Sequence, residues 1–492
     1  MPAFFPLLVR HRTVREELRL PLGGLLAFLL TFSASAVAQN PDLQTARAHA
    51  AALGAHHLCS GLWVVGRDYP RDADRVLAED IAPFPAFAWQ DDFRYDVNVE
   101  RRTVTVRGSD VGPKTAKYNG DQGCSILPDG AHDVYFEPVP AASTLPDASE
   151  QAWPMGDRES TGTLPASANA GRFEAALDWA MAQQEQNTRA FVVIHDGKIV
   201  GERYAPGWTK DTPQISWSQG KSITAALVGV LIQQGELALD EPAPVAAWRQ
   251  PGDPRGGITV ADLLHMSSGL GFANNGLSGL ESYNADNEHM RIYFDALNVF
   301  DHAVNQPQEI PPNAQFRYRN SDPLTLGRIV RETVEARGEE YLTFPRRALF
   351  DKIGARNYVL ETDPYGNFIM TGYDYGSGRD WARFGLLHLW DGEWNGERIL
   401  PKGWSEVVST PAPGDPTLGY GGLFWLNRGG RYDRIPEDAY WAAGFMGQTT
   451  MIIPSMDMVV VRLGPSARGF DGYINRAVGE IVESLRPASS SN

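Results

Sequence analysis

Cysteine and positive charge are both scarce in this chain of 492 residues. The two cysteines, Cys59 and Cys124, are too few to build a zinc site alone, and no His-Glu-x-x-His segment occurs. We therefore expect neither a metal nor another cofactor. The 44 basic residues are dispersed and outnumbered by 60 acidic ones, which gives a formal net charge of −16. This balance argues against nucleic acid or an anionic membrane surface as a partner.

Long apolar runs are also missing after the first 38 residues. Within those residues a basic stretch, residues 10–19, leads into the apolar run 20–32, and Ala36-Val37-Ala38 precedes Gln39. This order is typical of a signal peptide cleaved after Ala38, and the apolar run is short for a membrane-spanning helix. We expect residues 1–38 to be a signal peptide and the mature protein to be periplasmic or secreted. An uncleaved membrane anchor is the alternative interpretation.

The region 39–138 is expected to form an accessory layer of its own. It holds short strand-like runs, Gly61–Val65 and Arg102–Val106, bounded by Gly, Asp and Pro. In an oxidising compartment the Cys59 and Cys124 pair predicts a disulfide, although two buried thiols would also fit. The next residues, 139–171, are rich in Pro, Ala, Ser and Thr and are interpreted as a linker.

The main domain is predicted to span residues 172–487, followed by a tail at 488–492. Helical spacing of apolar residues predicts helices over 173–181, 222–234 and 473–485. Strands are expected at 191–194 and 199–202, where Asp196-Gly197 predicts a hairpin, and later at 421–425, 450–453 and 458–462. Strands at both ends with helices between them predict an α/β (α+β) fold with one antiparallel sheet and an inserted helical part.

One spacing in the chain points to nucleophilic chemistry. Ser218 stands where the helix over 222–234 should begin, and Lys221 lies three residues later on the same face. The rest of that helix is apolar, so the amine should be partly desolvated, with a lowered pKa that allows it to act as a base for the serine hydroxyl. Taken alone, Ser218 could equally be a helix-capping serine beside a surface lysine.

Two other patterns around this serine can be excluded. Gly220-Lys221-Ser222 matches the end of a phosphate-binding loop, but Ile215 stands where that pattern requires a glycine. A complete Gly-x-Ser-x-Gly, the nucleophile elbow of α/β-hydrolases, does not occur in the sequence.

Two further segments are candidates for the same site. Tyr318-Arg319-Asn320 follows a proline pair, and a phenol close to a lysine ammonium can lose its proton more easily and relay protons. Ala442-Ala443-Gly444-Phe445 precedes a predicted strand, where a backbone N–H could join that of Ser218 in an oxyanion hole. In isolation the tyrosine could simply be packed, and the glycine could mark a strand bulge.

Together, and in this order, the three segments resemble the serine β-lactamase/penicillin-binding-protein family. The similarity is greatest to its class C-like branch, which includes carboxylesterases and hydrolases of 6-aminohexanoate (nylon) oligomers. It extends to Ile258–Leu270, Arg379–Gly385, Asp391–Trp394 and Ile399-Leu400-Pro401, and covers roughly residues 172–487. The resemblance implies a five-stranded antiparallel sheet flanked by helices, with an inserted all-helical lobe.

The resemblance also implies roles for individual residues. Ser218 matches the acylated nucleophile, Lys221 its general base and Tyr318 the proton relay, while Asn320 matches the residue that helps to hold the lysine and substrate. The backbone N–H groups of Ser218 and Phe445 would be the oxyanion donors.

Other residues are candidates for the substrate pocket. Gly444 and Trp217 stand next to the expected oxyanion donors. Tyr283, Asp286 and His289 follow the segment that ends at Leu270 and could line the pocket or lie on the surface; we take Tyr283 as the candidate.

One departure from the family pattern bears on the substrate. Ala442 stands where β-lactam-processing members carry a cationic residue. We therefore expect an exported serine hydrolase that cleaves a small-molecule carboxylic ester or linear amide. A β-lactamase or D-Ala-D-Ala-type peptidase, and an inactive binding or sensor protein on the same scaffold, are the alternatives.

Overall fold

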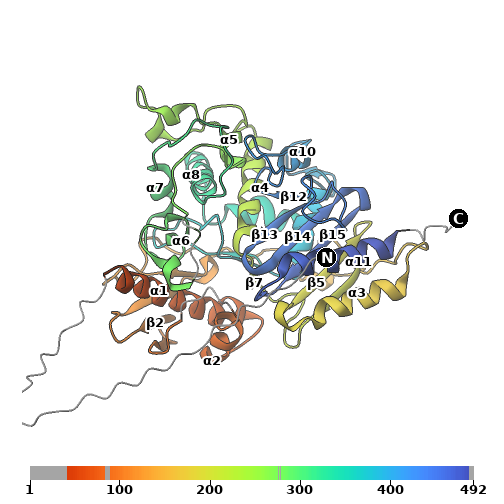
Figure 1. Cartoon of the computed structure of the whole chain (residues 1–492), viewed down its shortest axis with the longest axis horizontal. Helices are drawn as coiled ribbons and strands as arrows, with labels where there is room; N and C mark the ends of the chain where they lie inside the picture. Colours follow the sequence, from red (N-terminus) through yellow and green to blue (C-terminus); the bar gives the residue numbers. More distant parts are fainter. Residues whose placement is uncertain (1–40, 84–88, 275, 277–278, 487–492) are drawn as a thin grey trace, which may run out of the picture. The chain divides into compact units, whose positions relative to one another are not determined.

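An antiparallel sheet of six strands forms the centre of the chain after residue 170 (Figure 1). The computed structural model describes residues 41–83, 89–274, 276 and 279–486. The strand order is β12-β13-β14-β15-β5-β6. The strands are β5 (Ala190–His195), β6 (Lys198–Tyr204), β12 (Trp425–Leu426), β13 (Tyr440–Gly444), β14 (Gln448–Ile453) and β15 (Met458–Leu463).

This sheet confirms the expected fold class, but it has one more edge strand than expected. Five strands were expected, and the two-residue β12 adds a sixth by pairing with β13. The strand predicted over 421–425 is therefore wrong except at Trp425. Leu423 has a φ of 61°, which turns the chain away from an extended path just before β12.

The predicted hairpin at Asp196-Gly197 is confirmed. It joins β5 to β6, and φ is 48° at Asp196 and 66° at Gly197. Positive φ at both central residues is the geometry of a type I′ turn, whose twist matches that of the flanking strands.

Helices cover both faces of the sheet, as alternation along the strands requires. Phe191 and Val193 of β5 pack with α3 (Ala170–Ala182) and α11 (Phe470–Leu485), whereas Val192 and Ile194 belong to the core on the opposite face. That opposite face carries α9 (Gly378–Leu389), which packs on β14 and β15. Each large apolar side chain buried in this way stabilises the fold by about 1.5–3 kcal/mol.

A helical lobe is inserted between the two halves of the sheet, as expected. It follows α4 (Gly220–Gln233) and contains η9 (Gly279–Tyr283), α5 (Val260–Leu264), α6 (Glu288–Arg291), α7 (Val299–Val304) and α8 (Ser321–Ala336). The helix α8 packs on α4, α5 and α7.

A small sheet fastens the lobe to the segment that leads into α4. Its strands are β7 (Gln214–Ile215), β8 (Val359–Leu360) and β9 (Asp374–Gly376), in the order β7-β9-β8. The hairpin β10 (Glu393–Trp394) and β11 (Glu397–Arg398) and the helix α10 (Trp404–Ser409) lie between α9 and β12 in the chain.

The residues before the main domain form what we call the amino-terminal layer, residues 41–138. Its long helix α1 (Pro41–Trp63) and short helix α2 (Ala73–Val76) accompany an antiparallel sheet of four strands in the order β1-β2-β3-β4. The strands are β1 (Arg94–Asn98), β2 (Thr103–Arg107), β3 (Lys114–Tyr118) and β4 (Cys124–Ile126). The strand predicted at 102–106 is confirmed as β2.

The strand predicted at Gly61–Val65 is wrong, because residues 61–63 are the last turn of α1. The preceding residues are rich in alanine, the strongest helix former, and a helix once begun extends at little cost. Strands β2 to β4 and the lobe pack against this helix, so it is apolar on several sides. A short, wholly apolar run of this kind cannot be assigned to strand or helix by periodicity.

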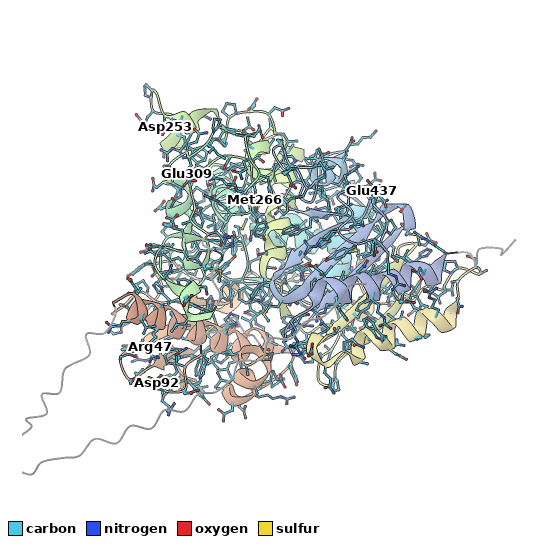
Figure 2. The ribbon with its side chains drawn as sticks, viewed as in Figure 1. Arg47, Asp92, Asp253, Met266, Glu309 and Glu437 are labelled. Atoms are coloured by element: carbon cyan, nitrogen blue, oxygen red, sulfur yellow. A yellow bond between two sulfur atoms is a disulfide. The ribbon has the colours of Figure 1, made fainter. Side chains whose placement is uncertain are left out.

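Covalent and ionic links hold the amino-terminal layer together. The predicted disulfide is present between Cys59 of α1 and Cys124 of β4, with a Cα–Cα distance of 6.1 Å. Closing a loop of 65 residues stabilises the fold by about 4 kcal/mol on the chain-entropy model. A guanidinium nitrogen of Arg47 lies 2.8 Å from Asp92 and 2.8 Å from Asp110. Figure 2 shows Arg47 and Asp92 close together in the amino-terminal layer.

Residues 40–492 form one compact unit in which the amino-terminal layer shares a core with the main domain. The connection predicted at 139–171 contains η4 (Ala148–Glu150) and is fastened to the body of the protein by Arg356, which donates to the carbonyls of Pro146 and Met155. Among the helices described, none is both long and apolar enough to cross a membrane. The predicted signal peptide, 1–38, and the tail, 488–492, lie outside the described residues.

Candidate active site

Ser218 lies in a tight turn at the start of α4. The 3-10 turn η6 (Trp217–Gln219) runs directly into the helix, and φ at Trp217 is 51°. Positive φ is costly for a large side chain and persists only where the surroundings enforce it. Here the N–H of Ser216 donates to the carbonyl of Asp374 in β9 (2.8 Å), which holds the turn against the small sheet.

Lys221 is the immediate partner of Ser218. Its Nζ lies 3.0 Å from Oγ of Ser218 and 3.1 Å from the carbonyl oxygen of Thr371. The side chain is 1% exposed, and burial lowers the pKa of Lys221 to about 7, although the nearby Asp374 carboxyl favours its charged form. A large fraction of the amine is therefore unprotonated at neutral pH and able to accept the hydroxyl proton.

Tyr318 comes from the lobe and completes a three-residue cluster. Nζ of Lys221 lies 5.0 Å from the centre of its ring. The expectation that a lysine charge eases loss of the phenol proton is not met: burial raises the pKa of Tyr318 to about 12, and a hydrogen bond with Ser218 offsets only part of this. Lys221 is not among the groups that shift the pKa of Tyr318. The phenol keeps its proton and is placed to donate it.

Asn320 is buried beside this cluster but holds Lys221 only indirectly. Its Nδ2 donates to the carbonyl of His289 (2.7 Å) and to the hydroxyl of Tyr293 (3.2 Å). The Tyr293 hydroxyl donates in turn to the Thr371 carbonyl (2.9 Å), the same oxygen that receives Lys221. The resemblance predicts that Asn320 helps to hold the lysine, and the hydrogen bonds of the structure connect it to Lys221 through Tyr293 and Thr371.

The turn around Ser218, residues 216–219, holds the predicted nucleophile, and we call it the nucleophile turn. The end of β13 approaches this turn very closely. A Cβ atom added to Gly444 would lie 1.9 Å from the carbonyl oxygen of Ser216, so only glycine fits. The ring of Phe445 packs edge-on against Trp217, with 5.8 Å between ring centres. Ser218 and Phe445 thus line the same pocket, and their N–H groups remain the predicted oxyanion donors.

A cavity of about 360 Å³ opens above Ser218. Nine of its nineteen lining residues are Phe, Tyr or Trp, and Arg431 is its one arginine. The candidates Trp217, Tyr283, Gly444 and Phe445 all line it, as does His289, whereas Asp286 is exposed and takes no part. The other lining residues are Leu53, Ser282, Met290, Tyr293, Tyr318, Trp425, Tyr432, Trp441, Ala443, Met446, Gly447 and Phe470.

Among the residues around the site that the sequence analysis did not identify are Arg431, Leu53 and Asp374. Arg431 reaches the pocket from the loop between β12 and β13, where it pairs with Asp471 (2.7 Å). Leu53 comes from the amino-terminal layer. Asp374 is buried under the nucleophile turn, so close that a Cβ on Gly220 would lie 2.2 Å from its Oδ1. None of the three belongs to a motif, and only packing between distant segments places them here.

The surroundings of Asp374 favour its neutral form. Burial raises the pKa of Asp374 to about 7, while Ser216, Lys221 and the backbone of Gly220 act in the opposite direction. Asp374 and Lys221 therefore form a coupled acid–base pair beneath the serine. Over the part of the chain that the structure describes, no group of three or more His, Cys, Asp or Glu side chains is placed to hold a metal ion.

Comparison with known proteins agrees with this geometry. The profile of the Beta-lactamase family matches residues 173–481. A 6-aminohexanoate-dimer hydrolase from Paenarthrobacter ureafaciens is 23% identical over 325 residues, which cover 61% of this chain and 80% of that protein.

Two solved structures share the fold. A penicillin-binding protein homologue from Caulobacter crescentus gives a TM-score of 0.51 at 14% identity, covering 66% of this chain and 99% of that chain. A family VIII carboxylesterase gives a TM-score of 0.51 at 15% identity, with the same two coverages. The resemblance predicted from the motifs is confirmed, and because the family match spans more than half of its residues, this chain belongs to the beta-lactamase family of serine hydrolases.

Proposed function

We propose that this family member cleaves a carboxylic ester or a linear amide through an acyl-enzyme on Ser218. The observation that carries the proposal is the 3.0 Å contact between Nζ of Lys221 and Oγ of Ser218, with the pKa of Lys221 near 7. A buried neutral amine at hydrogen-bonding distance is what a serine hydroxyl needs to become a nucleophile.

The proposed reaction takes place in two half-reactions. Oγ of Ser218 attacks the carbonyl carbon while Lys221 accepts its proton, and the N–H groups of Ser218 and Phe445 stabilise the oxyanion. Tyr318 donates its phenol proton to the leaving alcohol or amine and is reprotonated by Lys221. Water then attacks the acyl group and its proton passes to Lys221, after which Lys221 returns this proton to Oγ of Ser218 as the carboxylic acid leaves.

The composition of the pocket favours esters and linear amides over β-lactams. At the position where β-lactam-processing relatives carry a cation, Ala442 is fully buried, and its neighbour Ala443 lines the pocket. The aromatic lining suits an apolar substrate arm. Turnover of a chromogenic cephalosporin would instead support the β-lactamase alternative.

We also propose that the protein works outside the cytoplasm. The basic, apolar and small-residue order of residues 1–38 is that of an export signal. The Cys59–Cys124 disulfide supports this location, because disulfides persist mainly in oxidising compartments.

Fluorophosphonate labelling tests the nucleophile directly. The mature protein is expected to gain one adduct by intact-mass analysis, and Ser218→Ala is expected to gain none, because only an activated serine reacts readily with this probe. If neither folded protein reacts, Ser218 is not activated, and the binding or sensor alternative takes first place.

The pH profile of kcat/KM should report Lys221 together with Asp374, because the pKa values of both groups lie near 7. Only the unprotonated amine accepts a proton, so kcat/KM is expected to fall about tenfold per pH unit below the pKa near 7 and to level off above it. Tyr318 must stay protonated, and its pKa of about 12 predicts no loss of rate from this group between pH 8 and pH 10. His289 also faces Lys221, but burial lowers its pKa to about 3, so it adds no charge in this range.

Asp374→Asn tests the acid limb of that profile. With its pKa near 7, Asp374 is partly ionised around neutral pH, where its charge favours protonated Lys221. The variant removes that charge, so kcat/KM is expected to retain more of its plateau value near pH 7. Asp363→Asn is the matched control, because Asp363 is also buried with its pKa raised to about 6, and Lys221 is not among the groups that shift it. Equal profiles for both variants would contradict the coupling of Asp374 to Lys221.

A further inference from the structure

One face of α1 connects the amino-terminal layer to the main domain. Residues 49, 53, 56, 57 and 60 recur at intervals of three and four and so share a face of the helix. Figure 1 shows α1 running below α6, and the helix packs on η9 at the edge of the pocket. The family match begins at residue 173, so α1 lies outside the matched region while its partners in the main domain lie inside it.

A buried carboxyl group fastens this face to the main domain. Glu361, which directly follows β8, is fully buried and accepts hydrogen bonds from Oγ of Ser60 (2.8 Å) and the N–H of Cys124 (2.8 Å). Nε2 of His56 lies 2.8 Å from its other oxygen. The disulfide joins the two segments that bring these groups to Glu361, so three polar contacts and a covalent link act at one point.

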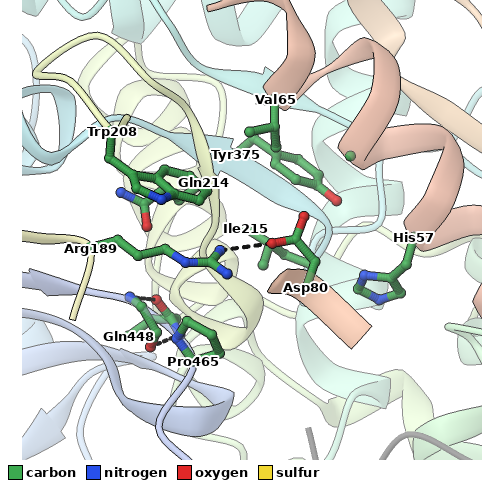
Figure 3. Close-up of a pocket in the computed structure, with 12 residues that line it drawn as sticks. His57, Val65, Asp80, Arg189, Trp208, Gln214, Ile215, Tyr375, Gln448 and Pro465 are labelled. Atoms are coloured by element: carbon green, nitrogen blue, oxygen red, sulfur yellow. Dashed lines mark hydrogen bonds and ion pairs between the residues drawn. The ribbon is translucent and has the colours of Figure 1, made fainter. Parts of the chain in front are cut away.

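A second link joins Asp80 of the amino-terminal layer to the main domain. Asp80 lies 2.9 Å from a guanidinium nitrogen of Arg189, the residue before β5 (Figure 3). Burial alone would raise the pKa of Asp80, but Arg189 and Arg71 hold it below its usual value. The cavity between them, which His57 and Tyr375 also line, measures only about 20 Å³. The contact between Asp80 and Arg189 is therefore closely packed.

Between these two links α1 reaches the catalytic pocket. The ring of His57 lies 5.3 Å from that of Trp217, the residue before the nucleophile. Burial lowers the pKa of His57 to about 3, so an uncharged ring packs there. Nδ1 of His49 lies 2.7 Å from the carbonyl oxygen of Tyr283, and one helical turn later Leu53 lines the pocket together with Tyr283 and Trp217.

We propose that the amino-terminal layer contributes a wall of the substrate pocket and that Leu53 is a specificity-determining residue of this enzyme. The Leu53 side chain is only 3% exposed and closes the part of the pocket wall that α1 contributes. It thereby limits the length of the substrate arm that fits. The proposal rests on the ester or amide hydrolysis proposed above, and extends it to a region outside the family match.

Chain-length preference tests the proposal. We would compare kcat/KM for p-nitrophenyl acetate, butyrate and octanoate, and for ethyl and octyl butyrate, in the wild type and in Leu53→Ala. Without the Leu53 side chain, the ratio of kcat/KM for the long substrate to kcat/KM for the short substrate should rise about tenfold in the acyl or the alcohol series. Space for a few methylene groups changes selectivity by about this factor. Leu53→Phe should change the same ratio in the opposite direction.

Leu58→Ala is the matched control. Leu58 is a fully buried leucine on the same helix that does not line the pocket, so its truncation should cost similar stability and leave the ratio within about twofold of wild type. Equal ratios for Leu53→Ala and Leu58→Ala, with no opposite change in Leu53→Phe, would overturn the proposal. A wild type that neither hydrolyses these esters nor reacts with fluorophosphonate would instead contradict the proposed function itself.

Discussion

Replacing Lys221 with methionine is expected to lower kcat/KM for an activated ester by about 10³-fold, because a positioned general base contributes about 10²–10⁴-fold. Methionine has a similar length and no proton acceptor, so Oγ of Ser218 loses the group 3.0 Å away that takes its proton. The measurement is kcat/KM at pH 8, together with the rate of fluorophosphonate labelling, which should fall in parallel.

Thermal unfolding separates this loss of rate from damage to the fold. In the unfolded chain Lys221 is protonated at pH 7, whereas in the folded protein its pKa of about 7 makes the charged form costly. This penalty is fully present below pH 7 and disappears as the pH rises towards the ordinary lysine pKa of about 10.4. Lys221→Met should therefore match or exceed the wild type in melting temperature at pH 7. Wild-type activity in a folded Lys221→Met would rule out Lys221 as the base.

Gly444→Ala is expected to lower kcat by about 10²–10³-fold, the usual effect of losing one oxyanion donor. The added methyl group would meet the Ser216 carbonyl at 1.9 Å and Cβ of Gln448 at 2.9 Å. Since backbone atoms cannot give way cheaply, the end of β13 must move from the nucleophile turn and take the N–H of Phe445 with it. Steady-state kinetics on p-nitrophenyl butyrate measures the change.

Gly472→Ala is the control for this substitution. Gly472 lies in α11 with open space around the added Cβ, and alanine in a helix is more stable than glycine by about 1 kcal/mol. Its activity should equal that of the wild type. If Gly444→Ala keeps a wild-type kcat, the end of β13 supplies no oxyanion donor and another N–H group must do so.

Local sequence was sufficient to predict those parts of the structure that lie within a single helix or turn. Ser218 and Lys221 are three residues apart at the start of a single apolar helix, so their contact follows from helix geometry. The Asp196-Gly197 hairpin follows in the same way from turn chemistry. Tyr318 and Phe445 lie far along the chain; their segments are candidates from the residues alone, but their roles are predicted by resemblance to a family, which carries tertiary information that spacing alone does not.

The error at Gly61–Val65 shows where local interpretation ends. The same apolar run fits a buried strand or the last turn of a buried helix, and the choice depends on what covers it. The strands of the amino-terminal layer and the lobe pack against α1, and these partners are distant in sequence. The helix that resulted brings Leu53 to the pocket, which the predicted strand did not suggest.

The amino-acid sequence was enough to predict the family, the pairing of Ser218 with Lys221, the alternation of the sheet and the disulfide, because each prediction depends on a short motif, a period or a count. The pKa values of Lys221, Tyr318 and Asp374, the indirect role of Asn320 and the contribution of α1 to the pocket emerge from the packed fold. The physical reason is that burial and close approach arise between segments far apart in the chain. Desolvation of a charge and exclusion of a Cβ exist only after those segments have packed.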